Sequence, residues 1–281
     1  MRLCTTVISL FCACNLTLTP ATHAQSTEAS VKSRLMNKPL YLRGCWSNNK
    51  LHFDSLGQRI GTSRPVPFTL CGFDLKYVRA KRDKLILEGE RVGLELADGN
   101  QKRVTLQVGT LGDSSSESIH IEVNASPNSD YDQALDAIFI EDLAALVPSL
   151  PFYWQNYAHK NFLPAAKVTA TATPSTTPQA QAHGISGNIK PPRPLRAPDP
   201  DWSNIYTRAL NYGGTVLINL QVNADGTVTR LSIVRALGMG LDESALAAVQ
   251  KYVFEPATQN GQPIPIELNI AVNFPTFRSA P

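Results

Sequence analysis

The stretch that decides the fold runs from Gly214 to Phe274 and reads GTVLINLQVNADGTVTRLSIVRALGMGLDESALAAVQKYVFEPATQNGQPIPIELNIAVNF. Its last part alternates strictly, with an apolar residue at every second position from Ile264 to Phe274. Such alternation is typical of a β-strand that buries one face and exposes the other. The chain therefore predicts a sheet near its carboxyl end.

Two more strands precede this one. Residues 215–222 alternate in the same way, and Asn223-Ala224-Asp225-Gly226 supplies a tight turn in which glycine tolerates positive φ. The return strand, residues 227–235, changes the phase of its apolar residues part of the way along, which predicts a β-bulge. These strands form an antiparallel hairpin.

A helix is expected between the hairpin and the last strand. Gly238-Met239-Gly240 interrupts the chain, and Asp242 is a suitable N-cap because its carboxylate can accept the free amides of the first turn. Apolar residues then recur at helical spacing, namely Ala245, Leu246, Val249, Tyr252 and Val253. We expect the helix to end at Phe254-Glu255-Pro256-Ala257 and a loop to follow at residues 259–261. The predicted fold class is α+β, with a small antiparallel three-stranded sheet, one packed helix and at least one exposed edge.

In its order of features, this segment resembles the TonB C-terminal family. The matching features are the Gly-led first strand, the Asp-Gly hairpin, GLDESAL, the helix end FEPA and the alternating last strand. Trp202-Ser203 stands where a Tyr-Pro pair is common in the family. The resemblance implies binding of a peptide segment from a TonB-dependent outer-membrane receptor by β-strand addition, which uses backbone hydrogen bonds. The partner-binding residues that we expect are Tyr206, Arg208 and Leu210 before the first strand, and Glu267, Asn269, Ala271 and Asn273 on the last strand.

The resemblance leaves two functions open. One is a TonB-like protein that supports energy-coupled transport across the outer membrane, driven by an ExbB/ExbD-type motor. The other is a soluble periplasmic adaptor or envelope scaffold that uses the same edge without a motor, including as a homodimer. The anchor of the family carries a Ser/His pattern for the motor, and residues 3–18 do not contain that pattern.

Residues 1–24 have the features of a secretory signal peptide. Arg2 precedes a mostly apolar run, and Ala21-Thr22-His23-Ala24 ends it with small residues, so cleavage is expected after Ala24. A lipoprotein modified at Cys14 and an uncleaved inner-membrane anchor are the alternatives. The signal peptide places the chain in the periplasm. Because that compartment is oxidising, Cys45 and Cys71, the two cysteines outside the signal, are candidates for a disulfide.

The rest of the chain divides into three parts. Residues 35–162 predict a mostly-β domain with several short strands and one helix, from Asp130 to Val147. Residues 163–197 are rich in Pro, Thr and Ala and predict a flexible linker, stiffened as polyproline at Pro191–Pro194, that lets the domains move independently. Residues 198–281 form the TonB C-terminal-like domain.

Little in the sequence indicates chemistry. The net charge of +3 is too small to indicate nucleic-acid binding. Motifs such as G-x-S-x-G, H-E-x-x-H and the P-loop are missing, and the histidines are scattered. We therefore expect no enzyme, no cofactor and no metal site.

Overall fold

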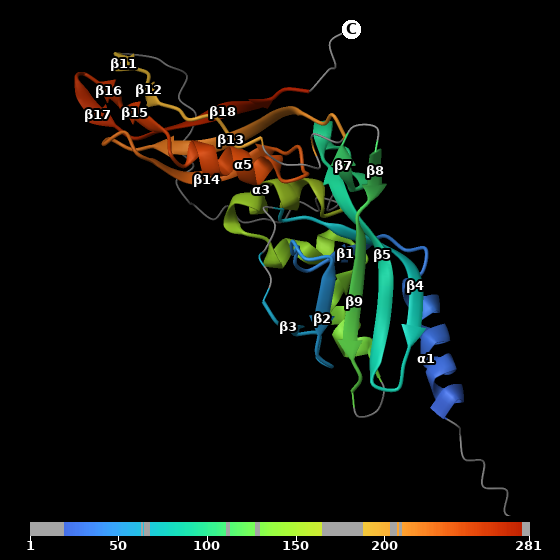
Figure 1. Ribbon diagram of the computed structural model, residues 1–281. Helices are drawn as coiled ribbons and strands as arrows, with labels where there is room; N and C mark the ends of the chain where they lie inside the picture. The colour runs from blue at the N-terminus through green and yellow to red at the C-terminus, as the bar shows by residue number, and fades with distance from the viewer. Residues whose placement is uncertain are drawn as a thin grey trace, which may run out of the picture.

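The structure, a computed structural model, describes residues 20–62, 64, 68–110, 113–126, 130–164, 188–202, 207 and 210–276. It places a mostly-β N-terminal domain at one end and a smaller C-terminal sheet at the other (Figure 1). The proposed signal peptide lies almost entirely outside the described residues. No helix within the described ranges is long and apolar enough to cross a membrane.

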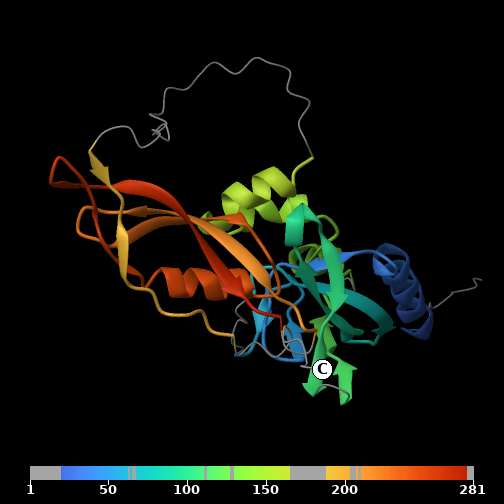
Figure 2. The same ribbon diagram turned by 90° about the horizontal axis from the view of Figure 1, so that it is seen from above.

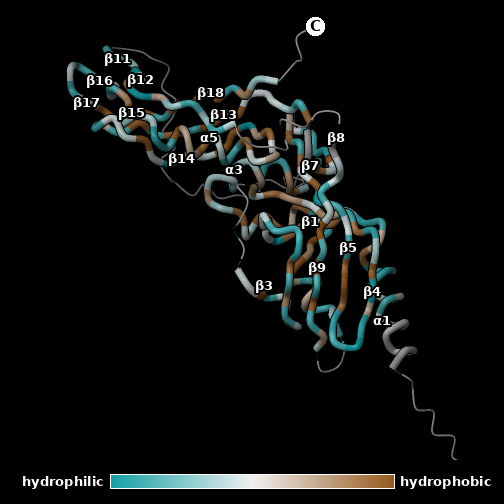
Figure 3. Tube along the Cα trace, viewed as in Figure 1, coloured by the Kyte–Doolittle hydropathy of each residue, from teal (hydrophilic) through white to brown (hydrophobic). Residues whose placement is uncertain are grey.

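The N-terminal domain is built on a sheet with the order β10-β1-β4-β5-β9-β2-β3, and β6 pairs with the far end of β5. Its strands are β1 (Leu40–Leu42), β2 (Lys50–Phe53), β3 (Arg59–Ile60), β4 (Gly72–Ala80), β5 (Lys84–Glu95), β6 (Lys102–Thr105), β9 (Ser118–Asn124) and β10 (Phe139–Ile140). A separate hairpin joins β7 (Gln107–Thr110) to β8 (Asp113–Ser116), and α1 (Pro20–Leu35) lies beside β4 (Figure 1). Apolar residues recur along the central strand β5 and alternate with polar residues along β9 (Figure 3).

The single helix that we predicted from Asp130 to Val147 was wrong. Instead, α2 (Asp132–Ile138) ends early, β10 follows it, and a 3₁₀ helix, η2 (Leu143–Ser149), comes next. The register pairs Leu42 with Phe139, so the backbone at β10 extends the edge of the sheet instead of continuing a helix. A further helix, α3 (Phe152–Asn161), was not predicted, and a short 3₁₀ turn, η1 (Ala97–Gly99), follows β5.

A disulfide joins Cys45 to Cys71, with a Cα–Cα distance of 6.1 Å. Both cysteines are buried in the core of the N-terminal domain. The bond ties the segment after β1 to the residue just before β4, a sequence separation of 26 residues. It therefore closes a loop that carries β2 and β3.

We expect the double variant Cys45→Ser, Cys71→Ser to lower the free energy of unfolding by about 3–4 kcal/mol, because the open chain has more conformational entropy when unfolded. Urea denaturation of the oxidised protein and of the variant measures the difference. A reducing agent serves as the control, since it should destabilise the wild type and leave the variant unchanged. Equal stabilities of wild type and variant would contradict a structural role for the bond.

The C-terminal sheet confirms the predicted fold class. Its order is β14-β13-β18, with β13 (Gly214–Val222), β14 (Val228–Arg235) and β18 (Ile266–Phe274), and the helix α5 (Leu241–Val249) packs against it. The predicted bulge is present, since the β13–β14 register shifts twice and Arg230 has a φ of 55°. The hairpin turn and the alternation therefore behave as the sequence indicated.

The helix ends earlier than its apolar stripe predicted. After Val249 the chain forms β15 (Val253–Glu255), β16 (Ala257–Gln259) and β17 (Gln262–Ile264), so the expected loop at residues 259–261 is the turn of a hairpin. The Phe254 amide donates to the Gly226 carbonyl at 2.9 Å, which draws this segment toward the first hairpin. This tertiary hydrogen bond holds Phe254 in a strand, although the spacing of the apolar residues favours a longer helix.

Part of the predicted linker belongs to the folded domain. Residues 165–187 lie outside the described residues, but β11 (Ile189–Lys190) pairs with β16, and β12 (Arg193–Arg196) pairs with β15. Pro194 therefore lies in a short strand instead of a free polyproline segment. All four side chains of β12 are exposed, as befits a strand added at an edge.

One of the two clusters of buried apolar residues spans both domains, which argues against the independent motion that we expected. Helix α3 lies between β14 and the N-terminal sheet, and the view from above places the C-terminal sheet and α1 at opposite ends of the molecule (Figures 1 and 2). The Leu96 amide donates to the Leu237 carbonyl at 2.8 Å, and Glu95 forms a β-bridge with Gly238. Buried residues of both domains form a single cluster, including Leu96, Trp154, Tyr157, Ile218 and Leu246.

Candidate functional site

The candidate site is the outer edge of β18. This strand pairs with β13 on one side, and within the described residues no strand pairs with its other side. In Figure 1 it forms the upper margin of the C-terminal sheet. An unpaired strand edge presents free backbone N–H and C=O groups, to which another strand can add.

The side chains of β18 separate into two faces. Its apolar residues point toward α5 and the shared core: Val272 and Phe274 are buried, whereas Ile266, Leu268 and Ile270 are only partly buried. The other face carries the four residues that we predicted as partner contacts, Glu267, Asn269, Ala271 and Asn273, all of them exposed. Their side chains therefore reach solvent beside the open edge.

The hairpin fixes the direction of the backbone groups. The Asn223 amide donates to the Thr227 carbonyl at 2.9 Å, so the N–H and C=O of Asn223 point toward β14. Because these groups alternate in direction along a strand, those of Val222 point to the opposite side, toward β18. The same holds for every second residue of β13 back to Gly214, since the β13–β18 register runs without a shift from Val222↔Ile266 to Gly214↔Phe274.

The register transfers this direction to β18. Residues paired with the even-numbered positions of β13 turn their N–H and C=O groups inward, and these residues are Ile266, Leu268, Ile270, Val272 and Phe274. The intervening residues turn theirs outward, and these are Glu267, Asn269, Ala271 and Asn273. The backbone donors of the open edge therefore belong to the same residues whose side chains are exposed.

Side chains on the outer face stabilise the edge strand. The Thr215 hydroxyl donates to the Asn273 side-chain oxygen at 2.7 Å, and the Asn219 side-chain Nδ2 donates to the Asn269 side-chain oxygen at 3.0 Å. Both pairs are directly opposite in the register. Cross-strand pairs of this kind each contribute roughly 0.2–1 kcal/mol. They hold β18 in place without using the outward backbone groups.

The three residues predicted before the first strand have different positions. Leu210 is partly buried and packs against the core of the N-terminal domain. Tyr206 and Arg208 lie outside the described residues. A partner role for these residues stays a prediction, as it does for the four residues of β18.

The acidic start of α5 holds the two domains together. The Asp242 carboxylate is fully buried and accepts hydrogen bonds from the Leu237 amide at 2.9 Å and the Gly238 amide at 2.6 Å. Our prediction that Asp242 is the N-cap was wrong, because Gly240 occupies that position. The two amides that donate to the Asp242 carboxylate belong to residues before the helix. The sequence could not show that this turn also touches β5.

Glu243 completes this junction. Its Oε1 atom accepts from the Thr69 amide at 2.9 Å and from the Trp154 indole N–H at 3.2 Å, and both donors belong to the N-terminal domain. Loss of water around these two neighbouring carboxyl groups raises the pKa of Asp242 well above its ordinary value and also raises the pKa of Glu243. The Glu243 charge raises the pKa of Asp242 further. The sequence analysis assigned no role to Glu243.

These shifts predict how stability depends on pH. A carboxyl group whose pKa is higher in the folded state binds more protons there, so its contribution to stability falls as pH rises from the unfolded pKa of about 4 through the folded pKa. We expect Glu243→Gln, which keeps an acceptor for Thr69 and Trp154, to gain stability relative to wild type as pH rises from 5 to 8. Urea denaturation at both pH values measures this difference. A difference that does not change with pH would contradict the raised pKa values.

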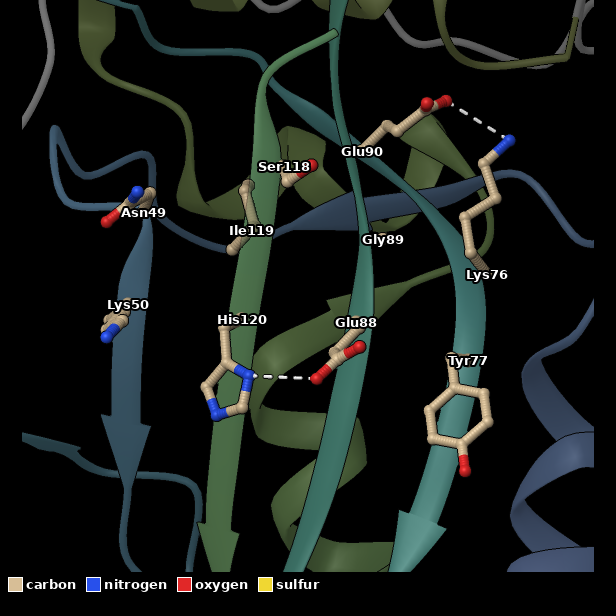
Figure 4. A pocket seen from close by; sticks show the side chains of 10 residues that line it. All are labelled: Asn49, Lys50, Lys76, Tyr77, Glu88, Gly89, Glu90, Ser118, Ile119 and His120. Atoms are coloured by element: carbon tan, nitrogen blue, oxygen red, sulfur yellow. Dashed lines mark ion pairs between the residues drawn. The ribbon is translucent and has the colours of Figure 1, made fainter.

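The polar face of the N-terminal sheet contains a hollow of about 360 Å³ (Figure 4). Both carboxylates that line it, Glu88 and Glu90, contact a basic side chain. Lys76 contacts Glu90 at 3.1 Å, and His120 lies 3.3 Å from Glu88 through Nδ1 and 3.2 Å from Glu122 through Nε2. Such pairing is typical of a solvated sheet face, and we assign no chemistry to it.

Comparison with known proteins bears on the C-terminal domain alone. Residues 206–276 match the family model described as Gram-negative bacterial TonB protein C-terminal. Among solved structures, the solution NMR structure of the Pseudomonas aeruginosa TonB CTD is 20% identical, and the match covers 34% of this chain and 94% of that chain with a TM-score of 0.28. No curated protein matches the chain.

Proposed function

We propose that this chain, whose residues 206–276 form a TonB C-terminal domain, binds periplasmic segments of TonB-dependent outer-membrane receptors and supports energy-coupled transport across the outer membrane. The observation that carries the proposal is the open edge of β18, where four consecutive outward-facing residues keep their backbone donors and acceptors free of strand partners among the described residues. A receptor segment would add to β18 as a fourth strand of the sheet.

The edge is preformed, which favours binding of an extended segment. The β13–β18 pairing spans nine register positions without a shift, and the outer-face side chains of Asn269 and Asn273 are held by Asn219 and Thr215. A rigid template loses little conformational entropy when a peptide adds to it. Members of this domain family are binding and transducing domains, and we propose no catalytic activity for the chain.

Binding is tested with the full-length protein. Isothermal titration calorimetry against synthetic copies of the periplasm-facing amino-terminal segments of the receptors from the same bacterium should give saturable binding. Segments scrambled in sequence serve as the control. If no receptor segment binds, or if scrambled segments bind equally well, the proposal fails.

A soluble adaptor or scaffold without motor coupling remains the second candidate, and the first residue of the mature chain separates the two. Mass spectrometry of the envelope fraction reads that residue directly. A chain that keeps Met1 in the inner membrane supports coupling to an ExbB/ExbD-type motor. A soluble chain that starts near Gln25 supports the adaptor.

A further inference from the structure

The open edge of β18 is bounded by proline at both ends. Pro265 comes directly before Ile266, whose backbone groups point inward, so the Pro265 nitrogen lies on the outward side of an extended strand. Pro275 follows Phe274 in the same way. Proline has no N–H, so both positions lack the donor that a partner strand would need.

A third proline, Pro263, also lies before the amino-terminal end of β18. Asn260 and Gly261, with φ of 52° and 81°, form the two-residue turn between β16 and β17, so Gln259 and Gln262 exchange hydrogen bonds across it. The backbone groups of Gln262 therefore point toward β16, and those of Pro263 point away from it. Three prolines thus occupy outward positions that flank the residues from Glu267 to Asn273.

The apolar face of β18 is unevenly covered. Val272 and Phe274 are 3% and 5% exposed, whereas Ile266, Leu268 and Ile270 keep part of their surface open. A strand added beside β18 would place every second side chain on this same face, next to the three partly covered residues. Apolar side chains at those positions would remove further apolar surface from water.

The polar face carries one uncompensated charge. Glu267 is exposed, and within the part of the chain that the structure describes it forms no ion pair, while its neighbours on that face are the uncharged Asn269, Ala271 and Asn273. A basic residue of the added strand that lies on this face near Glu267 complements its charge. The two faces therefore favour different residue types.

From these features we propose that the edge of β18 selects a partner segment of about seven residues, in which apolar residues alternate with polar ones and a basic residue lies beside Glu267. This inference rests on the proposed function and adds the length and the pattern of the partner. Four residues of β18, from Glu267 to Asn273, have outward backbone donors. They pair with the first, third, fifth and seventh residues of a seven-residue partner strand, whose side chains lie on the polar face. The second, fourth and sixth residues of that partner strand lie on the apolar face.

The pattern is tested with two peptides of equal composition. Lys-Val-Thr-Val-Thr-Val-Lys places all three valines on one face, whereas Lys-Thr-Val-Val-Val-Thr-Lys places only one there when its lysines lie on the polar face. Calorimetry with the full-length protein should give at least about tenfold tighter binding for the alternating peptide, since two more valines are covered. Glu267→Gln should weaken that binding about two- to fivefold at low salt. Equal affinities of the two peptides would overturn the inference.

The length is tested by removing one proline. Pro265→Ala restores one outward N–H, so the nine-residue peptide Lys-Val-Thr-Val-Thr-Val-Thr-Val-Lys should bind this variant about two- to tenfold more tightly than wild type, which is the usual effect of one hydrogen bond. The seven-residue peptide should bind both proteins equally. A gain for neither peptide, or for both, would overturn the proposed boundary.

Failure of this inference can be told from failure of the proposed function. If receptor segments bind the full-length protein while the two equal-composition peptides bind alike, the selection of a pattern is wrong and receptor binding stands. If neither the receptor segments nor the alternating peptide bind, both proposals are wrong.

Discussion

The Ala271→Pro variant is expected to bind receptor segments at least about tenfold more weakly than wild type. Proline removes the outward N–H of residue 271, and its ring occupies space that the backbone of the partner needs. Because this N–H faces away from β13, the pairing within the sheet keeps its hydrogen bonds. Calorimetry with a receptor segment measures the loss, and circular dichroism checks that the fold is retained.

Two matched variants make this result specific. Ala271→Ser keeps the backbone donor and should bind like wild type. Ile270→Pro removes an N–H that points at β13, so it should destabilise the C-terminal domain itself, by about 3 kcal/mol or more. Normal binding by Ala271→Pro would contradict strand addition at this edge. A folded and stable Ile270→Pro would show that the backbone directions assigned to β18 are reversed.

The second large effect is expected from Trp154, a residue of the N-terminal domain. Its side chain is 1% exposed, packs against Tyr157 with ring centroids 5.6 Å apart, and donates to Glu243 of α5. Trp154→Ala should lower the free energy of unfolding by about 3–5 kcal/mol, because it leaves a cavity in the core shared by both domains. Protection of the β13 amides against hydrogen exchange should fall with it.

Phe152 provides the control on the same helix. It is 76% exposed, so Phe152→Ala should change the free energy of unfolding by less than about 0.5 kcal/mol. If Trp154→Ala loosened only the N-terminal sheet and left the protection of β13 unchanged, the two domains would be energetically independent. That outcome would support the independent motion of the two domains that we predicted from the linker sequence.

The sequence predicted the elements whose signal is local. Alternation placed β13 and β18, the Asp-Gly turn placed the hairpin of β13 and β14, and the change of phase in β14 predicted its bulge. The same alternation placed Glu267, Asn269, Ala271 and Asn273 on one exposed face. It could not say which way their backbone groups point, since that depends on the register and on the Asn223–Thr227 hydrogen bond.

Three of the failures have non-local causes. The apolar spacing of Tyr252 and Val253 predicted a longer helix, but a hydrogen bond to Gly226 across the domain sets the conformation of the next residue. The proline-rich run at Pro194 lacks a strand signal, and it becomes a strand because the β15 edge is available to it. The role of Glu243 in GLDESAL could not be predicted, since its two donors come from residues far away in the chain.

The most direct test of the open edge is amide hydrogen exchange of the full-length protein, resolved by residue, with and without a saturating receptor segment. In the free protein we expect slow exchange at the inward amides of Leu268, Ile270 and Val272, and fast exchange at the outward amides of Glu267, Asn269, Ala271 and Asn273. Addition of the segment should protect those four outward amides together. If they stay unprotected while the segment is bound, or are already protected without it, β18 is not the receiving edge.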